Sequence, residues 1–150
     1  MLMSTMNKTS MKIKLFDTSL PTPAYQTNGS VAFDLYAREE TVVPAHSVVR
    51  VPVNIALELP AGHWAMVAAR SSLHKKGLML ANGIGVGDAD YCGDNDEYQV
   101  ALLNFSDTDI TVEKAERIAQ MLILPYTRVD LQVVEHLGNE DRGGFGSTGK

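Results

Sequence analysis

The chain has 150 residues, of which 45% are hydrophobic and 21% charged, values typical of one globular domain. A net charge of −5, with no Lys/Arg run longer than Lys75-Lys76, argues against polymeric nucleic acid as a partner. No apolar run reaches the roughly 18–20 residues of a membrane span, and the single cysteine, Cys92, favours a reducing, cytoplasmic setting.

Short β-type stretches separated by Pro, Gly and Asn dominate the chain after a polar tail, residues 1–10, which we treat as dispensable. A helix is predicted at residues 71–76, where two serines can cap its start and Gly77 can end it. Many short strands at intervals of roughly 8–12 residues indicate an antiparallel sandwich or barrel such as a jelly roll. We therefore predict one all-β domain at residues 11–138. Its strands are expected at residues 12–16, 31–37, 41–43, 48–53, 55–59, 63–68, 98–104, 117–124 and 129–134.

Arg70-Ser71-Ser72 lies between the predicted strand 63–68 and the predicted helix. An arginine with two hydroxyls at a helix N-terminus suits an anion. The same residues also fit a plain capping motif.

Residues 82–93 combine a glycine-spaced lead-in with acidic side chains. The acidic part, which starts at Asp88, resembles a calcium loop, but its fifth position is Cys92 and its twelfth, which should be Glu, is Gln99. Glycine inside a strand-like stretch often marks close approach of a ligand to the backbone. A carboxylate directly after such a stretch can serve as a general base. The alternative is an ordinary acidic turn.

Residues 139–150 are glycine-rich and lack hydrophobic periodicity, so we predict a mobile arm. The segment 144–150 matches two phosphate-loop patterns, but both require a helix to follow, and none can follow here. Phe145 between glycines suits a lid that stacks on a base. The four histidines show no metal-ligand spacing, so no zinc site is predicted.

These segments, in this order, resemble the five motifs of the trimeric dUTPase family, and the resemblance runs from Met11 onward. The motifs are Val31-Ala32-Phe33-Asp34-Leu35-Tyr36-Ala37, Arg70-Ser71-Ser72-Leu73, Asn82 to Gly93, Glu116-Arg117-Ile118-Ala119-Gln120-Met121 and Arg142 to Gly149. The resemblance implies a jelly-roll homotrimer with sites between subunits. It also implies hydrolysis of dUTP to dUMP and pyrophosphate, which keeps uracil out of DNA and supplies dUMP for dTTP synthesis.

The resemblance assigns a role to residues of each motif. It makes Asp88 the general base that activates a water for attack on the α-phosphorus, and it makes Asp34 and Arg117 an orienting pair. Mg²⁺ is expected on the triphosphate through water, with no direct protein ligand. For uracil and deoxyribose it implies Asn82, Gly83, Gly85, Val86, Gly87, Tyr91 and Phe145. For the phosphates it implies Arg70, Ser71, Ser72, Gln120, Arg142, Gly146, Ser147 and Thr148.

The chain departs from the family pattern at three places. Ala69 and Ser72 replace the usual Pro and Gly of the second motif, and Gly87 replaces the customary Ile before the base. The fifth motif is two residues shorter between Arg142 and Phe145.

Two alternatives remain open at this point. A dCTP deaminase of the same fold needs a catalytic Glu in the strand 98–104 and a second Arg after Leu73, and the sequence has neither. A non-catalytic nucleotide-binding module needs no base, whereas Asp88 and Tyr91 are both present.

Overall fold

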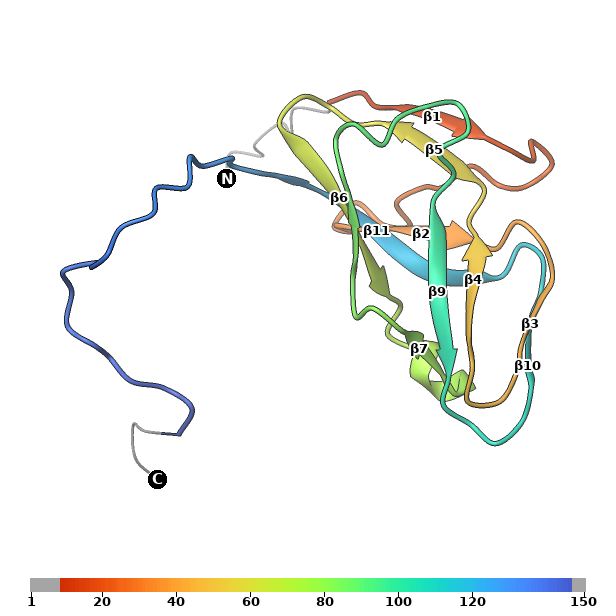
Figure 1. Ribbon diagram of the computed structural model, residues 1–150. Coiled ribbons are helices and arrows are strands. Elements are labelled where there is room, and N and C mark those ends of the chain that lie inside the picture. Colours follow the sequence, from red (N-terminus) through yellow and green to blue (C-terminus); the bar gives the residue numbers. More distant parts are fainter. Residues whose placement is uncertain (1–8, 147–150) are drawn as a thin grey trace.

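The computed structural model describes residues 9–146 and consists mainly of short β-strands (Figure 1). One helical turn, η1 (Leu73–Lys76), interrupts them. The strands are β1 (Lys12–Leu15), β2 (Phe33–Tyr36), β3 (Thr41–Val43), β4 (Val48–Pro52), β5 (Ile55–Glu58), β6 (His63–Ala69), β7 (Leu78–Leu80), β8 (Gly85–Gly87), β9 (Gln99–Asn104), β10 (Ile110–Val112) and β11 (Arg117–Pro125).

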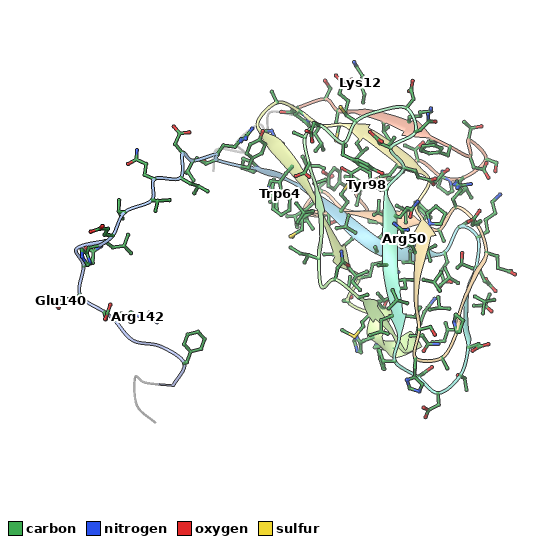
Figure 2. All side chains as sticks on the ribbon, viewed as in Figure 1. Lys12, Arg50, Trp64, Tyr98, Glu140 and Arg142 are labelled. Atoms are coloured by element: carbon green, nitrogen blue, oxygen red, sulfur yellow. The ribbon has the colours of Figure 1, made fainter. Side chains whose placement is uncertain are left out.

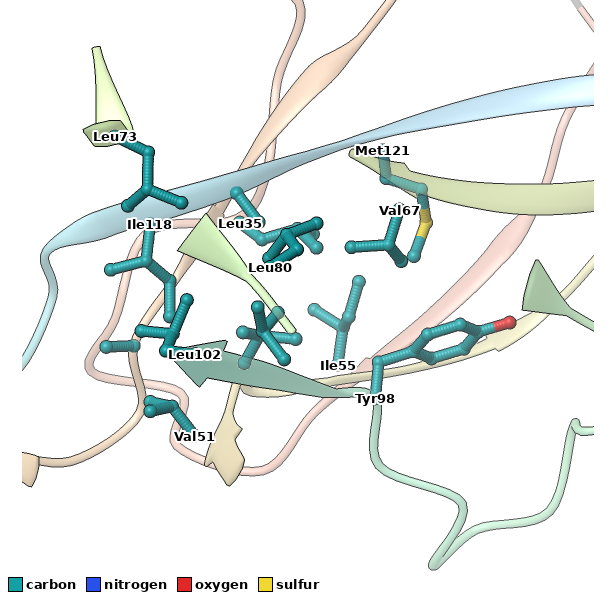
Figure 3. Packing of buried hydrophobic residues seen from close by; sticks show 14 of the residues in the cluster. Leu35, Val51, Ile55, Val67, Leu73, Leu80, Tyr98, Leu102, Ile118 and Met121 are labelled. Atoms are coloured by element: carbon teal, nitrogen blue, oxygen red, sulfur yellow. The ribbon is translucent and has the colours of Figure 1, made fainter. Parts of the chain in front are cut away.

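The strands form open antiparallel sheets. One sheet has the order β2-β11-β6-β8, a second has the order β4-β9-β7, and β1-β5 and β10-β3 are two-stranded pairs. A single apolar cluster joins the two larger sheets, with Leu35 of β2 and Met121 of β11 on one side and Val51 and Leu102 on the other (Figure 3). The predicted all-β, jelly-roll class is confirmed, and the sheets are open rather than closed into a barrel.

Alternation of side chains explains why these residues form strands. In β9, Val100, Leu102 and Asn104 are buried while the residues between them are more exposed, as expected for a strand with one face on the core. Asn104 can be buried because its Nδ2 donates to the carbonyl oxygens of Val43 and Thr108, at 2.9 and 2.7 Å. Its polar group is therefore satisfied, as buried polar groups must be.

Some boundaries differ from the sequence prediction. The predicted helix 71–76 is a 3-10 turn limited to Leu73–Lys76. Gly77 ends it in the left-handed region (φ 81°) as predicted, but Ser72 makes no side-chain cap. The three-residue strands β7, β8 and β10 were not predicted, whereas β3, which has the same length, was predicted at residues 41–43.

The predicted strand 129–134 is wrong, because residues 127–146 contain no regular secondary structure. This segment leaves the end of β11 and extends away from the β domain (Figure 1). Its apolar residues Val129, Leu131, Val133, Val134 and Leu137 are exposed. Within residues 9–146, no helix is long and apolar enough to cross a membrane.

Candidate active site

A pocket of about 380 Å³ lies beside β8 and the turn that follows it. β8 pairs antiparallel with β6, so that Gly85 faces Val67 and Gly87 faces Ala65. Among the described residues β8 pairs on one side only, so it is an edge strand of its sheet. The pocket brings together the predicted base, Asp88, and five of the residues predicted for uracil and deoxyribose, namely Asn82, Gly85, Val86, Gly87 and Tyr91.

The structure explains why residues 85 and 87 of β8 are glycines, which the sequence did not show. A Cβ on Gly85 would lie 3.0 Å from Cβ of Val67, and one on Gly87 would lie 2.4 Å from Oη of Tyr98. Both positions are therefore packed against the protein itself. Gly83 differs, because it adopts a left-handed φ of 72° in the turn that leads into β8, with nothing near its missing side chain.

Asp88 and Tyr91 sit at the two ends of one tight turn, since the Tyr91 amide donates to the Asp88 carbonyl at 3.1 Å. The Tyr91 hydroxyl donates to the Glu97 carbonyl at 2.9 Å, and its ring meets the Tyr98 ring edge-on at 5.4 Å. Partial burial, with help from the Asp96 and Glu97 carboxylates, raises the pKa of Tyr91. The phenol therefore stays neutral and its ring is held from two sides.

Glu97 and Arg38 support this turn and were not predicted from the sequence. The Glu97 carboxylate accepts from Arg38 Nε and Nη2 at 2.7 and 3.1 Å, and Oε1 also accepts from the Asn54 amide at 2.9 Å. A bidentate pair of this kind fixes the carboxylate in space. Glu97 is thus committed to holding the chain, and the exposed carboxylate in the pocket belongs to Asp88.

Two of the predicted phosphate residues, Arg70 and Gln120, lie in a second cluster around Asp34. Its Oδ1 accepts from Arg70 Nε at 3.0 Å and its Oδ2 accepts from Arg117 Nη1 at 3.2 Å, so the predicted pairing of Asp34 with Arg117 is present. Arg70 Nη1 also donates to the Arg117 carbonyl at 3.2 Å. Gln120 lies opposite Asp34 across the β2–β11 ladder, and its amide donates to the Ala69 carbonyl at 2.9 Å.

The strand pairing explains how this cluster forms. The β2–β11 register shifts between Arg117 and Ala119, which leaves Ile118 as the extra residue of a bulge. Bulges commonly redirect side chains at functional sites. Here Ile118 is buried in the core, while Arg117 is exposed and reaches Asp34. Ser71 and Ser72 are exposed at the end of β6.

The pocket and the cluster do not meet within one chain. Gly87 pairs with Ala65 near the start of β6, whereas Arg70 follows the end of that strand. Five residues of extended chain between Ala65 and Arg70 span about 16 Å. The structure therefore places the predicted base and the predicted phosphate cluster at opposite ends of β6.

The described part of the arm, residues 139–146, extends away from the β domain (Figure 1). Arg142 lies far from the β domain in Figure 2, and its Nε reaches only the Gly143 carbonyl at 3.5 Å. Phe145 is fully exposed, with a left-handed φ of 50°, and Gly146 is exposed beside it. The predicted Ser147 and Thr148 lie outside the described residues.

Trp64, the only tryptophan, was also missed by the sequence analysis. It lines a second pocket with Val86, Asp88, Asp90 and Tyr126. No signal in the sequence marks it, because its position depends on the pairing of β6 with β8. No group of three His, Cys, Asp or Glu side chains in residues 9–146 could hold a metal ion.

The chain is similar to known proteins in sequence and in fold. The dUTPase family model matches residues 18–149. The deoxyuridine 5'-triphosphate nucleotidohydrolase of Hydrogenobaculum sp. is 43% identical over 85% of this chain and 89% of its own. The crystal structure of the Streptococcus mutans dUTPase (TM-score 0.72, 28% identity) covers 79% of this chain and 98% of its own. The Staphylococcus bacteriophage 80alpha dUTPase with dUPNHPP, at 21% identity, has the same fold (TM-score 0.82, 95% of this chain and 100% of its own).

Proposed function

This chain belongs to the dUTPase family, and we propose that it hydrolyses dUTP to dUMP and pyrophosphate at a site shared between copies of the chain. Its activity is that of a dUTP diphosphatase. One observation carries the proposal: Asn82, Asp88 and Tyr91 line one pocket beside an edge strand with a free backbone.

Asp88 is the proposed general base. Its carboxylate is exposed in the pocket and makes no hydrogen bond with a described side chain, so it can orient and deprotonate a water. That water attacks the α-phosphorus of dUTP, and pyrophosphate leaves from the opposite side. Glu97 cannot replace it, because Arg38 and Asn54 already occupy its carboxylate.

The free edge of β8 is proposed to read the base. Uracil presents an acceptor, a donor and an acceptor, which backbone groups of residues 83–86 and the Asn82 carboxamide can match. Cytosine would leave buried groups unpaired, and a methyl at C5 would collide with the backbone. The Tyr91 ring, anchored on Glu97 and Tyr98, packs against deoxyribose and leaves no space for a 2′-hydroxyl.

The cluster around Asp34 is proposed to hold the triphosphate. Asp34 accepts from Arg70 Nε and Arg117 Nη1, and the Arg117 carbonyl accepts from Arg70 Nη1. The guanidinium donors of Arg70 and Arg117 that these bonds do not use are proposed to bind the phosphates together with Gln120, Ser71 and Ser72. This donor set suits phosphate oxygens rather than a bare cation. Mg²⁺ is therefore proposed to arrive on the triphosphate, bound mostly through water, where it neutralises phosphate charge.

Two features favour a homotrimer with sites between subunits. Asp88 and Arg70 lie at opposite ends of β6, about 16 Å apart along the backbone, which favours a site that takes them from two copies. The segment 127–137 also leaves apolar side chains such as Leu131 and Val133 exposed, which suits a segment that packs on another copy. In this assembly the arm brings Phe145 over uracil, and Arg142, Gly146, Ser147 and Thr148 to the phosphates.

Pyrophosphate release tests the activity. We expect efficient release from dUTP and little release from dCTP, dTTP or UTP at equal concentration. Equal turnover of dCTP and dUTP would contradict the proposed reading of the base, and no release from any of them would contradict the function.

Mixing two inactive variants tests the shared site. Asp88→Asn removes the base from one half of the site, and Arg70→Ala removes a phosphate ligand from the other. If each site takes its halves from different copies, trimers refolded from an equal mixture restore about a quarter of the sites. Activity that stays at the level of the separate variants would place both residues in the same chain's site.

A further inference from the structure

Tyr98 has the least explained side chain near the pocket. It is 6% exposed, and its hydroxyl oxygen is buried without a hydrogen-bond partner among the described residues. Leaving a buried hydroxyl unpaired is unfavourable, so a leucine or phenylalanine would suit a purely apolar core better. Figure 3 shows its ring at the border of the buried cluster.

The ring occupies the space that a side chain on residue 87 would need. A Cβ built on Gly87 would lie 2.4 Å from Tyr98 Oη, 2.8 Å from its Cε1 and 3.0 Å from the Ala65 Cβ. The phenol thus packs against the Gly87 backbone, which leads directly into Asp88. The space beside the Gly87 backbone can hold either a side chain on residue 87 or the Tyr98 ring, but not both. In this chain the Tyr98 ring occupies it.

The same ring also supports Tyr91. The two rings meet edge-on at an interplanar angle of 83°, a favourable aromatic arrangement. The Tyr98 backbone is itself fixed, because its amide donates to Ile55 at 2.9 Å and its carbonyl accepts from Val53 at 3.0 Å. A backbone fixed just before β9 therefore carries the ring that holds both the Asp88 backbone and the Tyr91 ring.

We propose that Tyr98 is a positioning residue of the dUTP site. Its ring fixes the position of the backbone that leads into Asp88 and the orientation of the Tyr91 ring. The selection of deoxyribose over ribose then depends on the fit between Gly87 and Tyr98. This proposal rests on the proposed function, because it concerns how the same pocket recognises its nucleotide.

Four variants test the proposal through the ratio of kcat/KM for dUTP to that for UTP. Tyr98→Phe keeps the ring, so the ratio should stay within about twofold of wild type. Tyr98→Leu removes the ring and should lower the ratio about tenfold, mainly through KM for dUTP. Gly87→Ala pushes a methyl into the ring and should lower the ratio as well. Gly87→Ala combined with Tyr98→Leu should recover part of that loss, because leucine vacates the space.

Val100→Ala is the matched control, since Val100 lies two residues further along and faces the same core. It should lower the melting temperature without moving the ratio. The proposal would be overturned if a folded Tyr98→Leu variant kept the wild-type ratio. It would also be overturned if the double variant lost as much of the ratio as the two single losses combined.

Two further measurements cover the cases in which a variant does not fold or the wild-type protein is inactive. If Tyr98→Leu does not fold, Gly87→Ala should be partly rescued by Tyr98→Phe, because the shortest contact of the added methyl is with the hydroxyl. No rescue would overturn the proposal. Wild-type protein that fails to hydrolyse dUTP would instead contradict the proposed function, so the two failures are distinguishable.

Discussion

Replacing Asp34 by Asn tests the phosphate cluster. The carboxylate is 14% exposed and accepts one hydrogen bond on each oxygen, from Arg70 Nε and Arg117 Nη1. The Asn side-chain amide has an oxygen on one side and an NH₂ group on the other. One of the two hydrogen bonds is therefore lost, and the arginine N–H that made it faces the NH₂ group of Asn. A hydrogen bond to a charged group contributes about 1.5–3 kcal/mol. Because the side chains of Arg70 and Arg117 are 28% and 44% exposed, solvent screens part of this hydrogen-bond free energy. We expect a loss of about 2 kcal/mol in the free energy of unfolding.

The assay for Asp34→Asn combines urea unfolding with kinetics. The unfolding midpoint should fall with an unchanged m-value, and KM for dUTP should rise about tenfold because Arg70 is no longer held. The affinity for deoxyuridine should not change, since it lacks phosphates. Glu58→Gln is the control, because it breaks an equally short ion pair with Lys12 that is exposed, and should change stability far less. Unchanged KM for dUTP in a destabilised Asp34→Asn would refute a phosphate role for the cluster.

Further changes address the base, the sugar, the buried phenol and the arm. Asp88→Asn should lower kcat by roughly 10²–10⁴-fold while a non-hydrolysable dUTP analogue still binds, as titration calorimetry can verify. Tyr91→Ala should narrow the preference for dUTP over UTP, and an unchanged ratio of kcat/KM would move sugar selection elsewhere. Burial, with Tyr91 and Asp88 nearby, raises the pKa of Tyr98 to about 12, above the unfolded value of about 10. Stability from neutral Tyr98 is therefore present below about pH 10 and lost as pH rises to 12, and Tyr98→Phe should flatten this fall in urea midpoints. Deleting residues 139–150 should leave a folded assembly by size-exclusion chromatography but nearly abolish hydrolysis, and a truncated protein of full activity would rule out a lid.

The longer strands could be predicted from the sequence because their side chains alternate. Val100 and Leu102 in β9, and Phe33 and Leu35 in β2, give the two-residue period that defines a half-buried strand. The segment 129–134 has similar composition, but a strand also needs a partner, and one chain supplies none there. Composition reports the propensity of a segment, whereas pairing depends on the rest of the assembly.

The site could be predicted where one motif holds all its parts, and at the Asp34–Arg117 pair, which the family resemblance implied. Asn82, Asp88 and Tyr91 lie within ten residues, and they share a pocket as expected. The support from Arg38, Glu97 and Tyr98 could not be predicted, since it joins segments far apart in the chain through side-chain geometry. Gly87 shows the limit well: the sequence reveals the missing side chain, but only the fold reveals that Tyr98 fills its place.

The position of β11 has a consequence for synthesis on the ribosome. β11 is the last strand within residues 9–146, yet it lies between β2 and β6 in the four-stranded sheet. The earlier strands cannot form this sheet until residue 125 has left the exit tunnel, so the domain folds only after β11 has emerged. Until then β2 and β6 keep unpaired edges, which are prone to pairing with other chains. A nascent chain that stalls before β11 should therefore depend on chaperones, whereas a chain that has emerged past residue 125 closes the sheet with β11.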